Sequence, residues 1–215
     1  MKDQSGISGY RYLDAGHSCA HSYLLPALRS ELSRFKPSLG SSKPRIFDLG
    51  CGNGSVAAFL ADEGWDVTGI DPSVEGIATA KATHPDLRLE LGSAYDDLAA
   101  KYGRFPVVVS LEVVEHIYAP RDYAKTLFDL VEPGGTAMIS TPYHGYLKNL
   151  ALALSGKMDR HFTALWDHGH IKFWSIPTLT TLLIDAGFDS VYFHRVGRVP
   201  AFAKSMIAIA QKKTS

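Results

Sequence analysis

Apolar runs and amphipathic stretches alternate along most of the chain from residue 45 onward. Short apolar runs bounded by glycine or polar residues are typical of strands buried in a parallel sheet. Such runs lie at residues 46–49, 65–70, 87–91, 105–110, 136–140, 191–196 and 206–210. Apolar residues recur at helical spacing in 73–82 and 122–131, and helices are also expected at 56–63 and 177–186. The alternation predicts an α/β fold, in which a mostly parallel sheet is covered by helices on both faces.

Two segments depart from this alternation. Residues 21–35 carry leucines at helical spacing and predict an amphipathic helix, and a Pro/Ser/Gly-rich stretch at 36–44 leads from it into the first strand. Residues 143–174 interrupt the alternation after the fifth strand and are rich in histidine and aromatic residues. Because binding and catalytic residues concentrate in such insertions, we expect 143–174 to contribute to a functional site.

A glycine-rich turn joins the first strand to the first helix of the core. Gly50, Gly52 and Gly54 follow Asp48, and Asp71 lies 23 residues after Asp48 at the tip of the second strand. Glycines allow a tight turn and a close approach of ligand to backbone, while the helix presents free N–H groups. A carboxylate at the second strand tip is suited to a ribose diol. The two features predict an adenosine-containing cofactor, against the alternative of an ordinary turn without ligand.

The motifs along the core resemble those of one enzyme family. Asp-x-Gly-x-Gly-x-Gly at 48–54 is similar to the first motif of class I S-adenosylmethionine-dependent methyltransferases. Glu-Val-Val-Glu-His at 112–116, Leu-Val-Glu-Pro-Gly-Gly at 130–135 and the strand ending Ser-Thr-Pro at 140–142 resemble the fourth and fifth motifs. The set, which spans residues 45–142, most resembles the ubiquinone-biosynthesis O-methyltransferase branch.

The resemblance implies a fold and a domain organisation. It implies a doubly wound, mostly parallel, seven-stranded Rossmann-like sheet that ends in an antiparallel pair. Residues 1–215 would form a single methyltransferase domain. Within it, 1–44 would be a helical lid, 45–142 the cofactor-binding core, 143–174 a substrate cover, and 175–215 the last helix and closing strands.

The resemblance also implies S-adenosyl-L-methionine as the cofactor. Asp48 would order the loop and help to hold the methionine end, Asp71 would bind the ribose, and Ser93 stands where the family usually has an acid for the adenine. The expected cofactor-binding residues are Asp48, Gly50, Cys51, Gly52, Asp71, Pro72, Ser73, Ser93, Ala94, Tyr95, Leu111 and Glu112.

His116 is the expected catalytic residue. Methyl transfer to a phenol requires removal of a proton whose ordinary pKa is about 10, and an imidazole is suited to this at neutral pH. An alternative is that Glu112, Glu115 and His116 bind Mg²⁺ or another divalent ion, which would lower the pKa of a catechol-like acceptor. We favour the prediction that His116 acts as a base without a metal ion.

Expected substrate contacts are Tyr10, Tyr12, His168, His170 and Trp174. The histidines at 161, 168 and 170 have spacing that suggests zinc, but no cysteine or clear fourth ligand lies near them. Their aromatic surroundings favour the rim of a substrate pocket or a packed loop.

Composition narrows the partners. Basic and acidic residues number 22 each, so no overall field attracts nucleic acid. No apolar run is long enough for stable membrane insertion, the first residues lack the order of a signal peptide, and Cys19 and Cys51 are expected to be reduced thiols, so we predict a cytoplasmic protein. The predicted function is methylation of a small molecule, at the oxygen of a phenolic or quinol-type acceptor. The alternatives are methylation at nitrogen or carbon, a nicotinamide oxidoreductase, and a cofactor-binding protein without catalysis.

Overall fold

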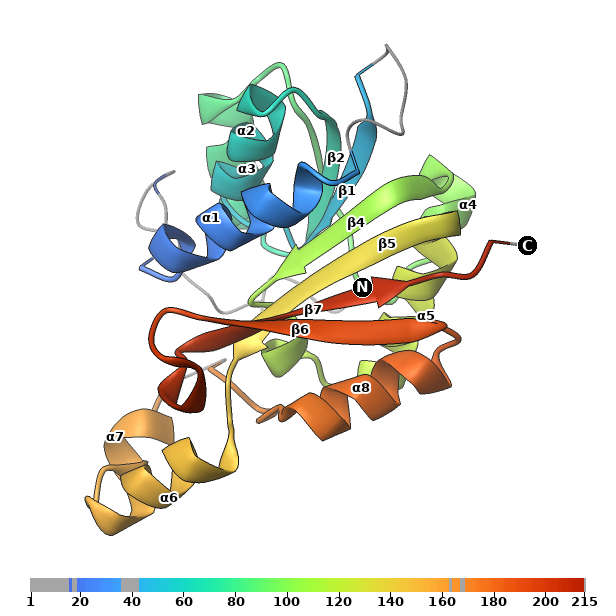
Figure 1. Ribbon diagram of the computed structural model, residues 1–215. Helices are drawn as coiled ribbons and strands as arrows, with labels where there is room; N and C mark the ends of the chain where they lie inside the picture. Colours follow the sequence, from blue (N-terminus) through green and yellow to red (C-terminus); the bar gives the residue numbers. More distant parts are fainter. Residues whose placement is uncertain (1–15, 17–18, 36–42, 163, 167–168, 215) are drawn as a thin grey trace.

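A computed structural model describes residues 16, 19–35, 43–162, 164–166 and 169–214, and among them seven strands form one sheet (Figure 1). The order of the strands is β3-β2-β1-β4-β5-β7-β6. They are β1 (Arg45–Leu49), β2 (Asp66–Asp71), β3 (Arg88–Leu91), β4 (Phe105–Leu111), β5 (Val131–Pro142), β6 (Ser190–Val196) and β7 (Ser205–Gln211). β7 runs antiparallel to both of its neighbours, β5 and β6, whereas β1 to β5 are parallel. The predicted α/β class and seven-stranded sheet are confirmed.

Helices cover both faces of the sheet. They are α1 (His21–Leu32), α2 (Ser55–Asp62), α3 (Val74–Thr83), α4 (Leu98–Tyr102), α5 (Pro120–Leu130), α6 (Tyr146–Leu154), α7 (Met158–Phe162) and α8 (Ile176–Asp185), with short 3₁₀ turns η3 (Val114–His116) and η4 (Pro200–Phe202). Buried residues of α1, α2 and α3 form one core with one face of the sheet, and those of α4, α5 and α8 form a second core with the other face (Figure 1). Strand β4 contributes to both cores, with Val107 and Val109 on one side and Val108 on the other, as expected for a central strand.

The strand order places a switch point between β1 and β4. The chain proceeds from β1 outward to β2 and β3, and from β4 in the opposite direction to β5. In open α/β sheets, ligands bind beyond the carboxyl ends of the strands at such a point. The segments that follow β1 and β4, residues 50–54 and 112–116, therefore meet at the expected binding crevice.

Local sequence explains several helix boundaries. Ser73 accepts a hydrogen bond from the N–H of Gly76 and caps α3, while Ser175 and Thr178 form a capping box at the start of α8. The short helix α4 was not predicted; Asp97 caps it, but its five residues are too few to give a periodic signal. The strand expected at 136–140 begins earlier, since β5 includes residues 131–135, and its pairing with β4 shifts register between Phe105 and Val107.

The N-terminal helix α1 packs firmly on the sheet. Leu24 and Leu28 are fully buried. The buried carboxylate of Glu31 accepts a hydrogen bond from the Tyr192 hydroxyl of β6 at 2.9 Å and contacts His194 Nε2 at 2.9 Å. α1 is therefore part of the fixed core, and a movable lid would have to come from other parts of residues 1–44.

The insertion at 143–174 contains α6 and α7, which project beyond the end of β5 (Figure 1). Neither helix contains a buried residue. None of the helices among the described residues combines the length and apolar character needed to cross a membrane.

Candidate active site

The glycine-rich loop after β1 needs glycine for two reasons. Gly50, Gly52 and Gly54 have φ values of 90°, 52° and 81°, a backbone region that residues with a side chain rarely adopt. A Cβ on Gly50 would also overlap the side chain of Val113, in the segment after β4. The loop is held to β2, since Gly50 N and Cys51 N donate to the carbonyl of Ile70 at 2.8 and 3.0 Å. Its conformation is thus fixed by the neighbouring strand end.

Asp71 organises this loop from the end of β2. One carboxylate oxygen accepts from Gly52 N at 3.0 Å and the other accepts from Ser73 N at 2.7 Å. Burial raises the pKa of Asp71 to about 6, although these two hydrogen bonds oppose the rise. Sequence reasoning expected Asp71 to bind a ribose, and the structure adds a role in shaping the glycine loop.

Asp48 provides the test of whether the loop fits S-adenosylmethionine. Its carboxylate is buried, and Oδ2 has no hydrogen-bond partner among the described residues. Burial and the nearby charge of Asp71 raise the pKa of Asp48 to about 7. A buried acceptor oxygen without a partner, two residues before the glycine loop, fits a ligand that carries positive charge and N–H donors, as S-adenosylmethionine does.

The expected adenine contacts form a compact turn after β3. Ser93 N donates to the Asp96 carboxylate at 2.8 Å, and Tyr95 N donates to Ser93 Oγ at 3.2 Å. The Tyr95 hydroxyl accepts from Ala119 N at 3.1 Å and so joins this turn to the segment after β4. Ser93 therefore supports the turn, in the position where the resemblance implies an acid.

Glu112 begins the segment after β4 with an unusual backbone conformation. Its φ is 55°, the only positive value for a residue other than glycine in the described part of the chain. Ser140 Oγ donates to Glu112 Oε1 at 2.8 Å, and Glu112 N donates to Ser140 Oγ at 2.9 Å. Burial raises the pKa of Glu112 to about 7. The side chain is thereby held against Ser140 of β5.

Glu115, His116 and His170 form the main cluster of titratable side chains. One potential ligand atom from each side chain lies within 4.8 Å of those of the other two. Among the described residues, this is the only group of three or more His, Cys, Asp or Glu side chains close enough to hold a metal ion. His170 Nε2 lies 4.0 Å from Glu115 Oε1, and the rings of His116 and His170 are 4.9 Å apart. The structure thus brings His170, rather than Glu112, to Glu115 and His116.

The pKa values of Glu115 and His170 are both shifted in the direction that favours the neutral form. Burial and the charge of Glu112 raise the pKa of Glu115 well above its ordinary value, and neither of its carboxylate oxygens has a hydrogen-bond partner among the described residues. Burial and the neighbouring His116 and His161 lower the pKa of His170 to about 4. His116 Nδ1 lies 3.2 Å from the carbonyl oxygen of Gly169. Because a carbonyl only accepts, this contact assigns the proton of the neutral imidazole to Nδ1.

The other expected substrate residues have mixed outcomes. Trp174 is buried, and its Nε1 donates to the carbonyl of Val114 at 3.1 Å, so it positions η3 and does not face the cavity described below. Tyr10, Tyr12 and His168 lie outside the described residues. Of the two expected residues that the structure describes, His170 lines this cavity and Trp174 does not.

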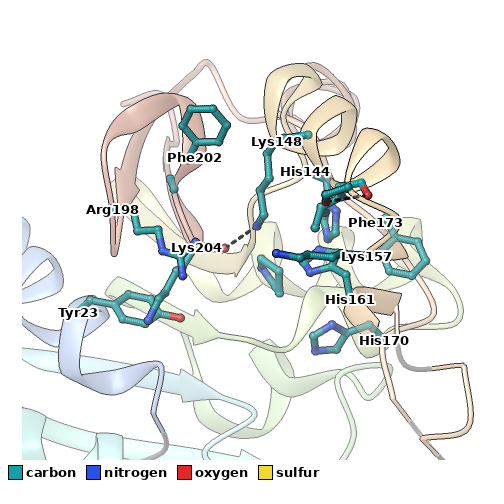
Figure 2. Close-up of a pocket in the computed structure, with 15 residues that line it drawn as sticks. Tyr23, His144, Lys148, Lys157, His161, His170, Phe173, Arg198, Phe202 and Lys204 are labelled. Carbon is teal, nitrogen blue, oxygen red and sulfur yellow. Dashed lines mark hydrogen bonds between the residues drawn. The ribbon is translucent and has the colours of Figure 1, made fainter. Parts of the chain in front are cut away.

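A cavity of about 520 Å³ lies between α1, the end of β5, the insertion and the β6–β7 connection (Figure 2). Its walls include Tyr23, His144, Lys148, His170, Arg198 and Lys204. Sequence reasoning placed a pocket under 143–174 but missed Tyr23, Arg198 and Lys204. These residues lie outside the insertion in sequence and belong to no motif, so only the fold brings them to the cavity.

Comparisons with known proteins identify the family. A family model described as a methyltransferase domain matches residues 20–192. A ubiquinone biosynthesis O-methyltransferase of Cereibacter sphaeroides is 30% identical over 187 residues, which cover 85% of this chain and 75% of the relative. One of the same name from Caulobacter sp. (strain K31) is 36% identical over 133 residues, covering 58% of this chain and about half of the relative, 52%.

A solved structure shows the same fold. The SAM-dependent methyltransferase of Methanosarcina mazei superposes with a TM-score of 0.61 at 21% identity, over 84% of this chain and 98% of its own. The family match sets aside the nicotinamide oxidoreductase alternative. This chain belongs to the S-adenosylmethionine-dependent methyltransferases.

Proposed function

We propose that this protein methylates the oxygen of a small phenolic or quinol-type acceptor. The observation that carries the proposal is the imidazole of His116, which follows β4 at the switch point, three residues after Val113, the residue that lies against Gly50 of the glycine loop. The two curated relatives described above are named as O-methyltransferases, which supports oxygen as the acceptor atom. Methylation at nitrogen or carbon is the alternative that the test below separates.

The residues after β1, β2 and β3 would hold the cofactor. Asp48 and the backbone of 50–52 would bind its methionine end, Asp71 with Pro72 and Ser73 its ribose, and Ser93 to Tyr95 its adenine. Leu111 and Glu112 would lie beside it at the end of β4. When bound, S-adenosylmethionine supplies an electrophilic methyl carbon on a sulfonium whose sulfur leaves as a neutral thioether.

His116 would act as the general base. With the Nδ1 proton directed at the Gly169 carbonyl, Nε2 is the ring nitrogen that accepts a proton from the phenol. Trp174 would fix the position of His116 through its hydrogen bond to Val114, two residues earlier in η3. Alignment of acceptor oxygen and methyl carbon would supply much of the remaining rate enhancement, about 7–11 kcal/mol in well-oriented systems.

The insertion would exclude water from the reaction. α6 and α7 form one wall of the cavity and carry no buried residues of their own, as a movable cover requires. We keep the division into cofactor-binding core, cover and closing strands as part of this proposal, and we assign α1 to the core. Because the net charge is zero, the acceptor would be a small molecule and not nucleic acid. Because both cysteines are free thiols, the protein would act in the cytoplasm.

A two-part experiment tests the proposal. Calorimetry should show S-adenosylhomocysteine binding in the micromolar range, about −8 kcal/mol. Transfer of radiolabelled methyl should then be measured on catechol, on aniline and on an enolisable carbon acid of similar size. Transfer to catechol oxygen supports the proposal. Cofactor binding with transfer only to nitrogen or carbon would refute O-methylation, and absence of cofactor binding would refute the assigned site.

A further inference from the structure

The cavity under the insertion is lined by cations and by no acid. Lys148 comes from α6, Lys157 from the turn between α6 and α7, and Arg198 and Lys204 from the β6–β7 connection. None of the residues that line the cavity is aspartate or glutamate. Figure 2 shows Lys148, Arg198 and Lys204 reaching toward a common space from opposite walls. Positive charge from separate segments thus converges on one cavity.

Lys148 is the cation most constrained by this arrangement. Its side chain is partly buried, and Nζ donates to the carbonyls of Tyr143 at 2.8 Å and Lys204 at 3.4 Å. Burial and the charge of Arg198 lower its pKa to about 8. No ion pair links Lys148, Lys157, Arg198 or Lys204 to a carboxylate in the part of the chain that the structure describes.

Some cations elsewhere on the protein form ion pairs with carboxylates. Arg29 pairs with Glu63 at 2.9 Å, and Lys101 pairs with Glu90 at 3.0 Å. Of the four cavity cations, Lys148 is half-buried, and the other three are exposed. Withdrawing the Lys148 ammonium from water without an ion-pair partner costs free energy, and an anionic ligand would offset that cost.

The cavity adjoins the proposed reaction centre. His170 lines the cavity and packs against His116, with their ring centroids 4.9 Å apart. Pro142, which ends β5, also lines it, and β5 pairs directly with β4, the strand that leads to Glu112. The volume, about 520 Å³, lies in the range of pockets that hold a substituted aromatic ring. A ligand held by the cations would therefore lie beside His170, whose ring packs against His116.

We propose that the methyl acceptor carries an anionic group, a carboxylate or a phosphate, which Lys148, Arg198 and Lys204 bind while its hydroxyl faces His116. This inference rests on the proposed function and names the substrate class of the same site. The guanidinium of Arg198 offers a fork of donors that suits either anion, and the two ammonium groups add charge without a fixed geometry. Phe173, in the same wall, provides a face for the aromatic ring.

Matched acceptors test the inference by binding, so that it does not depend on turnover. Calorimetry on the protein saturated with S-adenosylhomocysteine should compare 3,4-dihydroxybenzoate, its neutral methyl ester and 3,4-dihydroxyphenyl phosphate. We expect at least one of the two anions to bind about tenfold or more tightly than the ester, because charge-assisted hydrogen bonds are lost in the ester. The tighter anion then distinguishes carboxylate from phosphate.

Variants locate the effect. Arg198→Met alters an exposed side chain and should weaken binding of the preferred anion about tenfold while leaving the ester unchanged. Lys148→Met should also weaken binding of the preferred anion. If loss of the Lys148 hydrogen bonds impairs folding, Arg198→Met alone tests whether the cavity cations bind the anion. Lys81→Met, an exposed change on α3, is the control and should alter neither affinity.

The outcomes separate this inference from the proposed function. Equal or tighter binding of the ester, or an anion preference that survives Arg198→Met, would overturn the anionic acceptor, and methylation of the ester would still support O-methylation. A preference for the anion that Arg198→Met abolishes supports the inference. Such binding without methylation of any of the three compounds would refute the reaction and retain the anion site.

Discussion

Ser140 and Glu112 form a reciprocal pair across β4 and β5: Ser140 Oγ donates to the Glu112 carboxylate at 2.8 Å and accepts from the Glu112 backbone N–H at 2.9 Å. Two adjacent strands thus hold the residue with the unfavourable φ of 55°. Such strain persists only where the surrounding structure fixes it, and it is common at functional sites.

Ser140→Ala should therefore destabilise the protein more than Ser110→Ala. Ser110 is also fully buried, but its hydroxyl makes one hydrogen bond, to the carbonyl of Leu49 at 2.8 Å. Above pH 7 the Glu112 carboxyl group is mostly ionised, and loss of a hydrogen bond to a charged group costs more than loss of a neutral one, so at pH 8 we expect an additional loss of about 1 kcal/mol. Urea unfolding of the two variants measures the difference, and equal losses would show that the pair does not restrain Glu112.

Gly50→Ala and Gly64→Ala separate steric overlap from backbone strain. Their φ values are 90° and 89°, but a Cβ on Gly64 would meet nothing within 4 Å, whereas one on Gly50 would overlap Val113. Gly64→Ala should cost about 1–2 kcal/mol from strain alone. Gly50→Ala should cost more and also weaken binding of S-adenosylhomocysteine, which calorimetry would detect.

A double variant provides the control for the overlap. Gly50→Ala combined with Val113→Ala removes the obstructing methyl groups and should recover part of the lost cofactor affinity. If Gly50→Ala binds the cofactor as tightly as Gly64→Ala does, the loop does not approach the ligand closely.

Asp48→Asn should change how stability depends on pH. The pKa of Asp48 is raised from 3.8 to about 7 in the folded protein, so the folded state binds this proton more tightly than the unfolded chain. Its stabilising contribution is therefore full below pH 4 and lost as pH rises through 7. Relative to the wild type, Asp48→Asn should gain about 2–3 kcal/mol of stability between pH 5 and pH 8. Urea unfolding without ligand measures the free energies of unfolding of both proteins at pH 5 and pH 8. If Asp48 is ionised throughout, the difference between the variant and the wild type will be the same at both pH values.

His116→Ala should reduce methyl transfer to the acceptor about 10²–10⁴-fold while cofactor affinity is retained, because it removes a general base. EDTA should have no effect. If Glu115, His116 and His170 bind a divalent ion, EDTA should abolish activity, Mg²⁺ or Mn²⁺ should restore it, and His170→Ala should be nearly as damaging as His116→Ala. Metal-dependent turnover with an inactive His170→Ala enzyme would contradict a base that acts without metal.

Hydrogen exchange should distinguish the insertion from the N-terminal helix. Amides of α6 and α7 should exchange quickly in the free protein and slow down when S-adenosylhomocysteine and an acceptor are bound. Amides of α1 should exchange slowly in both states, because Leu24 and Leu28 are fully buried. Identical exchange of α6 and α7 in the two states would argue against a cover.

The core could be predicted because its motifs are local in sequence. The alternation of strands and helices, the glycine loop and Asp71 all depend on short spacings, and the structure places Asp71 against Gly52 within that loop. The site beyond the core depends on tertiary contacts. His170 reaches Glu115 from a segment 55 residues later, and Trp174 turns inward to Val114 although its position suggested a pocket rim.

The contact between Glu31 and Tyr192 has a consequence for the order in which the protein is assembled during synthesis. The two residues are 161 positions apart, so α1 leaves the ribosome long before its hydrogen-bond partner on β6 exists. At usual rates of translation the interval is roughly 10–30 s. During that time the leucines of α1 have no complete surface to pack against. α1, the first helix of the described chain to be made, must therefore be among the last to dock, and a nascent chain halted before β6 should expose it to protease.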